Sequence, residues 1–375
     1  MAVATGSVKR DILKQICWTF VPIWLIACNN SVTPPPAVSQ SKWQIFTASN
    51  SPISNNYIHD ISVDDQKRVW FATDNGAFYF DRSYWGATIR DSLCTNTGRD
   101  ANCTVYSITQ AKDRAIWFAT AQGGVVRYQP NSESKVWTRY TERDSAFDHP
   151  LSLAGDHSSA SLYGQIWVTS SQGVSQFTQS TNELGAWKRF RSGDVSNLPT
   201  NQVYVVKINP IDNIVWFGTA TGGPVKAEYS TGGILGWTPI DIPVDLDSKI
   251  NSIAFDLNDV VWFGTETRGI VVLDRANGSW GQYSQDSTRY RRGSPGHALP
   301  NVPVRAVVTD YARTRWFGTD SGLVRLSDSV WTRFTKSNSP LPSDTITALE
   351  FDVRGNLWIG TTSGIGAYND GGLIF

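Results

Sequence analysis

Short apolar runs alternate with polar turns along this chain, as in Thr345 to Phe375, where TITALEFD, LWIGT and IGAYND are separated by VRGN and TSG. Runs of this length, bounded by turns rich in Gly, Asp and Asn and lacking a 3.6-residue period, are typical of small antiparallel sheets. The pattern therefore predicts β-strands rather than helices.

Tryptophan marks the recurrence of this pattern. Of sixteen tryptophans, fourteen follow residue 42 and fall into two sets of seven. One set opens a Trp-apolar-small-Thr box at intervals of 47, 50, 49, 46, 54 and 42 residues: Trp70, Trp117, Trp167, Trp216, Trp262, Trp316 and Trp358. The other set mostly opens a Trp-x-x-aromatic string: Trp43, Trp85, Trp137, Trp187, Trp237, Trp280 and Trp331. A period of about 40 to 50 residues with four strands per repeat is typical of β-propellers. We therefore predict an all-β, seven-bladed β-propeller over residues 43–375.

The box predicts how neighbouring blades pack. Its third position is small in six blades, which indicates close backbone approach, whereas blade three departs and reads IWVTSS. The Thr that follows favours a strand and offers a hydroxyl for a local hydrogen bond.

The order of the two tryptophan sets predicts how the ring closes. The first outer string, WQIF at Trp43, precedes every box, and the chain ends after Trp358 before another such string. We therefore expect the N-terminal strand to complete the C-terminal blade and to leave no open sheet edge.

The first 27 residues have the layout of an export signal. Three basic residues precede the apolar run ICWTFVPIWLIA, which is about twelve residues long and shorter than the roughly 20 that a spanning helix needs. The tetrapeptide that ends at Cys28 resembles the lipobox of bacterial lipoproteins. We predict a signal peptide over 1–27, a lipidated Cys28 that holds the protein on a membrane, and a flexible tether over 28–42. The alternative is an ordinary signal peptide with a chance cysteine.

Two further cysteines, Cys94 and Cys103, flank the polar stretch TNTGRDAN. In an oxidising envelope they are predicted to form a disulfide that closes this loop. The alternative, metal binding, would need two more ligands, which no CxxC or HxxH spacing supplies. We expect neither a metal nor a cofactor.

The charge of the chain bears on its partners. Lys and Arg number 33 and Asp and Glu number 33, so the net charge is zero at pH 7. A neutral chain gives no electrostatic reason to expect nucleic acid as a partner.

The strings NLWIGTTSGIGAY, RWFGTDSGLVRL and LPSDTITALEFDVRGN resemble the two-component regulator propeller repeat, and the resemblance recurs over residues 43–375. In that family the repeats form the extracytoplasmic sensing part of membrane-bound histidine kinases. This sequence contains no kinase module, so the resemblance implies at most a recognition role and no phosphotransfer.

Comparison of the repeats separates packing positions from variable ones. Twelve and nine residues before each box Trp the chain is apolar in six blades, whereas the position eleven residues before it varies. In blade four all three positions lie one residue further back. If the first strand is innermost, these variable residues form one ring around the channel and suit ligand binding: His59, Tyr106, Tyr204, Asn251, Arg305 and Thr347. The alternative is channel filler hydrogen-bonded to water.

A second candidate is the long connection STRYRRGSPGHALPN before the first strand of blade six. Its basic and aromatic side chains suit an acidic glycan or an acidic protein segment: Arg289, Tyr290, Arg291, Arg292 and His297. The alternative is a solvated surface loop.

The sequence motifs give little support for an enzymatic function. The sialidase Asp-box, quinoprotein repeats, nucleophile elbows, HExxH and phosphate loops are all absent. A lyase would need a base near a charge-neutralising group, and only His59 with Tyr106 and Arg305 offers this. We assign no catalytic residue.

The sequence thus favours a lipid-anchored recognition propeller of the cell envelope that binds an oligosaccharide or a protein. A polysaccharide lyase is the alternative and a structural scaffold the third hypothesis. Asn29 after the lipidated cysteine favours the outer over the inner membrane in a host with two.

Overall fold

The computed structural model describes residues 41–86, 92–93, 103–122, 124–130, 136–141, 149–156, 164–178, 185–194, 198–230, 233–243, 247–284, 299–310 and 313–375. These residues lie in one compact unit, Gln40–Phe375. They form 28 strands and no helix, so within these ranges no helix could cross a membrane.

The strands form seven antiparallel sheets of four, which confirms the predicted seven-bladed β-propeller. Blade one contains β2 (Ile58–Val63), β3 (Val69–Thr73), β4 (Gly76–Asp81) and β5 (Tyr84–Trp85). Blade two contains β6 (Val105–Gln110), β7 (Ile116–Thr120), β8 (Gly124–Gln129) and β9 (Val136–Tyr140). Blade three contains β10 (Pro150–Gly155), β11 (Gln165–Ser170), β12 (Gly173–Thr178) and β13 (Ala186–Phe190). Blade four contains β14 (Val203–Ile208), β15 (Val215–Thr219), β16 (Pro224–Ser230) and β17 (Gly233–Pro239).

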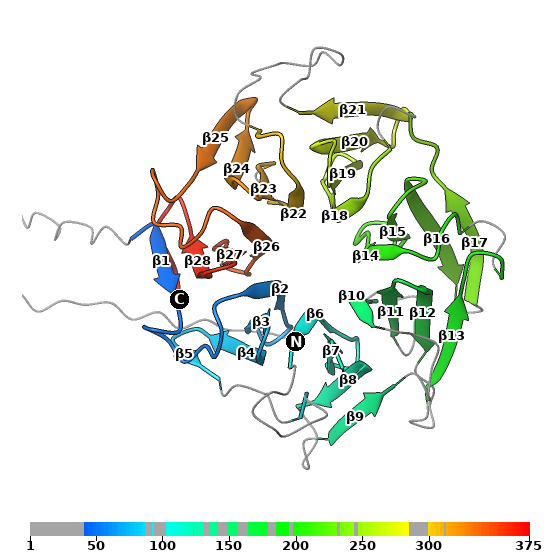
Figure 1. The fold of residues 1–375 in the computed structure, drawn as a ribbon, viewed down its shortest axis with the longest axis horizontal. Helices are drawn as coiled ribbons and strands as arrows, with labels where there is room; N and C mark the ends of the chain where they lie inside the picture. Colours follow the sequence, from blue (N-terminus) through cyan, green and yellow to red (C-terminus); the bar gives the residue numbers. More distant parts are fainter. Residues whose placement is uncertain are drawn as a thin grey trace, which may run out of the picture. The chain divides into compact units, whose positions relative to one another are not determined.

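Blade five contains β18 (Ile250–Phe255), β19 (Val260–Thr265), β20 (Ile270–Asp274) and β21 (Ser279–Tyr283). Blade six contains β22 (Val304–Thr309), β23 (Arg315–Thr319), β24 (Gly322–Ser327) and β25 (Val330–Phe334). Blade seven contains β26 (Ile346–Phe351), β27 (Leu357–Thr361), β28 (Gly364–Tyr368) and the N-terminal strand β1 (Trp43–Phe46). The first strand of each blade is nearest the centre, and β26 contacts β2 to close the ring (Figure 1).

Closure by the N-terminal strand is confirmed. β1 pairs antiparallel with β28, and Trp43 lies opposite Tyr368. Two further hydrogen bonds extend the contact, because the amides of Asn369 and Leu373 donate to the carbonyls of Lys42 and Ser41, each at 3.0 Å. The last blade therefore combines both ends of the propeller chain.

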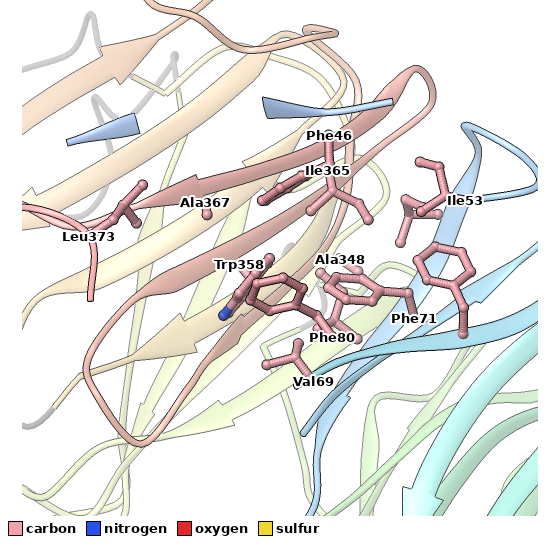
Figure 2. Close-up of a cluster of buried hydrophobic side chains, with 13 residues drawn as sticks. Phe46, Ile53, Val69, Phe71, Phe80, Ala348, Trp358, Ile365, Ala367 and Leu373 are labelled. Carbon is pink, nitrogen blue, oxygen red and sulfur yellow. The ribbon is translucent and has the colours of Figure 1, made fainter. Parts of the chain in front are cut away.

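The tryptophan box packs one blade against the next. In three blades the indole Nε1 donates to an aspartate in the turn between the first two strands: Trp70 to Asp64 at 2.8 Å, Trp262 to Asp256 at 3.1 Å, and Trp358 to Asp352 at 3.0 Å. Figure 2 shows how Trp358 of blade seven lies among apolar side chains of blade one, including Phe71 and Phe80. Each blade thus buries its faces against its neighbours.

The small third position of the box is explained by the same packing. A Cβ added to Gly318 would lie 2.8 Å from Ile346 of the next blade, and one added to Gly360 would lie 2.8 Å from Ile58. The box threonine also makes the expected local bond, as Thr361 Oγ1 donates to the carbonyl of Gly364 at 2.8 Å. Blade three makes the same bond at 3.2 Å through Ser170. Its departure from the box therefore preserves the turn.

Candidate functional site

A cavity of about 680 Å³ opens at the centre of the ring, between the innermost strands. All six residues of the predicted ring line it: His59, Tyr106, Tyr204, Asn251, Arg305 and Thr347. Leu151 of blade three, which the sequence comparison left out, lines it as well. The structure thus brings the variable positions of all seven blades to one cavity.

A repeated backbone irregularity explains why these positions are free of the core. In every blade the register between the first and second strands shifts across the second residue of the first strand, as between Ile58 and Asp60. The extra residue of such a bulge leaves the ladder, and its side chain is re-aimed. We call these seven the bulge residues: His59, Tyr106, Leu151, Tyr204, Asn251, Arg305 and Thr347.

Three bulge residues are fixed by an acidic partner fifteen residues later in the same blade. His59 Nε2 lies 2.6 Å from Asp74 Oδ1, and Asn251 Nδ2 donates to Glu266 Oε2 at 2.9 Å. Arg305 donates through Nε and Nη2 to the carboxylate of Asp320, with Nη2 at 2.8 Å, and this hydrogen bonding raises the pKa of the guanidinium. The charge of Arg305 is therefore balanced within the protein.

Aromatic rings crowd one side of the cavity. The ring of His59 lies between Tyr57 and Tyr106, with centroid distances of 4.5 and 5.5 Å. On another blade, the ammonium of Lys249 lies 4.3 Å from the ring centroid of Tyr204. Such arrangements suit flat or amphipathic ligands, whose apolar faces stack on tyrosine.

Ionisable side chains also line the cavity at the third and fifth positions of the innermost strands. They are Asp60, Lys207 and Glu350. Burial raises the pKa of Glu350 to about 7, against the opposing charge of Lys207. Burial likewise raises the pKa of Asp60. None of these three was among the residues predicted from the sequence.

Asp60 has a structural role. Its Oδ2 accepts hydrogen bonds from Ser107 Oγ at 2.8 Å and from the amide of Ile108 at 2.9 Å, both on blade two. The equivalent residue Ser252 joins blades five and six in the same way, by accepting from the amide of Val307 at 2.9 Å. Hydrogen bonds of this kind hold adjacent innermost strands together, which leaves Lys207 and Glu350 as the unexplained charges.

Several predicted site residues lie outside the described residues. These are the lipidation candidate Cys28, the cysteine Cys94, and the basic loop with Arg289, Tyr290, Arg291, Arg292 and His297. Cys103 is disulfide-bonded, and its pairing with Cys94 stays a prediction. Within the described ranges, no three His, Cys, Asp or Glu side chains are grouped as a metal site requires.

Seven four-stranded sheets around a central cavity define a seven-bladed β-propeller. Two of its segments, residues 52–75 and 340–363, match the family model described as the two component regulator propeller. They cover the start of blade one and the start of blade seven. The resemblance seen in the sequence is thereby confirmed for these two repeats.

Solved structures share the fold. Extracellular domains assigned to hybrid two component systems of B. thetaiotaomicron match at TM-scores of 0.66 (BT4673, 17% identity) and 0.64 (BT3049, 19% identity). The match covers 88% of this chain in both cases, but only 40% and 42% of those domains. This chain therefore spans about two fifths of their length.

A third similar structure is virginiamycin B lyase from Staphylococcus aureus, with a TM-score of 0.60 and 17% identity over 87% of this chain and 98% of the lyase. A search of curated proteins found no match. At identities this low the likeness establishes the shared fold.

Proposed function

We propose that this protein is a recognition propeller of the cell envelope that binds a glycan or a protein segment in its central cavity. The observation that carries the proposal is the convergence of seven bulge residues on one cavity, because a bulge takes these residues out of the regular ladder and all seven line the cavity. Similarity to extracellular domains of sensor systems supports an envelope or extracellular location.

Two of the bulge residues offer the sharpest test. Tyr106→Ala and Tyr204→Ala should each weaken binding by about 1 to 2 kcal/mol, because stacking area is lost, while hardly changing stability. Ligands come from an array of neutral and acidic oligosaccharides, and affinities and melting curves are then measured for each variant.

The matched control is Ile253→Ala in the core, which should lower the free energy of unfolding by about 2 to 5 kcal/mol. Ile253 is only 1% exposed. If the tyrosine variants melt early like this control, the bulge residues serve packing and the proposal fails. Normal binding by both tyrosine variants would also contradict it.

Lipid anchoring at Cys28 belongs to the same proposal. Cys28→Ser should abolish incorporation of radioactive palmitate and release the protein from washed membranes, because acyl chains supply the buried apolar area that holds it there. Labelling that persists in the variant would refute the anchor.

A second candidate function is elimination catalysis at His59. The 2.6 Å contact with Asp74 orients this imidazole beside Tyr57 and Tyr106, and a general base needs such an orienting partner. Similarity to a lyase over 98% of its length favours testing it. The array ligands are incubated with the protein and assayed for new unsaturated sugar ends. Cleavage that is lost in His59→Gln would support a lyase. A protein that neither binds nor cleaves any array ligand would instead favour a structural scaffold.

A further inference from the structure

The positive charges of the central cavity differ in how they are balanced. Arg305 is paired with Asp320. Lys207 and Lys249 also line the cavity, but within the described part of the chain neither ammonium has a hydrogen bond or a carboxylate within ion-pair distance. The two lysines are therefore the cationic groups that remain available to a ligand.

One of these lysines contacts an aromatic ring, and the other is on the strand that carries that ring. Lys207 is on β14, the strand that also carries Tyr204, and Lys249 covers the ring of Tyr204 from the start of blade five. A ligand beside Tyr204 would therefore have the ammonium of Lys249 next to it, on the neighbouring blade. The second cation, Lys207, is three residues further along the same strand as Tyr204.

Glu350 occupies a distinctive place in the channel. It lines the central cavity and also a second cavity of about 550 Å³, formed by the turns at the other end of the innermost strands. Of the residues that the structure describes, no other lines both of these cavities.

The charged groups around Glu350 come from several blades. Lys207 and Asp60 act on it directly, and His59, Lys249 and Arg305 line the same cavity. The second cavity adds four carboxyl groups: Asp64, Asp65, Asp310 and Asp352. Asp64 and Asp65 are paired with Arg68 and Arg114, so Lys207 is the cation that acts on Glu350 itself.

We propose that the central cavity recognises an acidic saccharide, whose carboxylates are bound by Lys207 and Lys249 and whose binding drives proton uptake by Glu350. This proposal rests on the proposed ligand-binding function and names its ligand class. A volume of about 680 Å³ suits a compact ligand, since small-molecule pockets span roughly 300–1,000 Å³. The tyrosine faces favour sugar rings over a flexible acidic peptide.

The proton coupling follows from the charges. Burial raises the pKa of Glu350 to about 7 in the free protein, although the positive charge of Lys207 acts to lower it. A carboxylate paired with Lys207 cancels this lowering, so the pKa of Glu350 is higher in the complex. Binding therefore takes up protons. Affinity should be greatest below pH 7 and fall as the pH rises from 7 towards the pKa of the complex.

The test uses trisaccharides of galacturonate, glucuronate and mannuronate together with their methyl esters, which keep the ring and remove the charge. The protein should bind at least one acid about tenfold more tightly than its ester, since a hydrogen bond to a charged group is worth about that factor. Lys207→Met and Lys249→Met should each abolish this preference. Lys226→Met, whose ammonium lies 3.0 Å from Glu228 outside the cavity, is the matched control and should keep it.

Calorimetry at pH 7.5 in two buffers of different ionisation enthalpy measures the proton uptake. Uptake should disappear in Glu350→Gln and persist in Glu228→Gln, whose carboxylate lies outside the cavity beside Lys226. Melting curves establish that each variant is folded. Equal affinity for every acid and its ester, or no binding of any acid, would overturn the inference, as would unchanged uptake in Glu350→Gln.

The ligand class and the site can fail separately. If Tyr106→Ala weakens binding of a neutral sugar while Lys207→Met does not, the ligand-binding function stands and the acidic ligand class is wrong. If no array ligand responds to either tyrosine variant, the proposed function itself is wrong.

Discussion

A chain that begins at residue 51, and so lacks β1, should lose about 5 kcal/mol or more of its free energy of unfolding. Phe46 is 6% exposed and contacts Phe80, Trp85 and Trp358, with ring centroids 5.8, 5.1 and 6.0 Å away. Truncation of one buried aromatic costs about 3–5 kcal/mol, and this deletion removes Trp43 as well as Phe46. It also exposes the edge of β28.

The control for this deletion is a chain that begins at residue 41. It keeps β1 and the carbonyls of Ser41 and Lys42, which accept the two hydrogen bonds from the C-terminal segment. Denaturant titration of both truncations measures the difference. Equal midpoints would show that the N-terminal strand does not hold the ring closed.

The second large effect is expected for Trp358→Ala, at about 3–5 kcal/mol. Trp358 is fully buried, and its ring lies 5.4 Å from both Phe71 and Phe80 of blade one (Figure 2). The substitution leaves a cavity between blades seven and one and removes the donor to Asp352. Because this boundary also contains β1, the damage falls where the ring is closed.

Val330→Ala provides the comparison, since Val330 is 62% exposed on β25. It should change the free energy of unfolding by no more than about 0.5 kcal/mol. Denaturant unfolding, followed by tryptophan fluorescence, compares the two variants. A loss below about 1 kcal/mol for Trp358→Ala would mean that this boundary is not a cooperative part of the core.

The fold was predictable because every blade meets the same packing problem and solves it with the same residues. Trp262 and Trp316 recur at the box position because each must fill the space beside the next blade, and glycine follows where Ile346 approaches Gly318. Closure was predictable for the same reason. Trp43 belongs to an outer strand, but no tryptophan box precedes it in the sequence, so its blade must be completed by the other end of the chain.

The site was predictable only in part. The bulge residues could be found as a variable position among constant ones. Their acidic partners were not found in this way, because Asp74 comes close to His59 only when the first two strands of the blade form a hairpin. The comparison of repeats treated each position separately and did not consider such pairs. Lys207 and Glu350 occupy one equivalent position where other blades carry small or apolar residues, such as Ala254 and Val308. A search for isolated charges at apolar or small positions would have detected both.

The spacing between bulge residues and their partners affects how such a site can be redesigned. His59 with Asp74, and Arg305 with Asp320, each belong to one hairpin, so a blade contributes its side chain to the cavity together with the group that orients it. An exchange of a single hairpin that keeps the residues facing the neighbouring blades, such as Ile58 and Asp60, would therefore transfer a side chain together with the group that orients it. The three blades that carry such a pair are thus modular units, from which new specificity can be assembled one blade at a time.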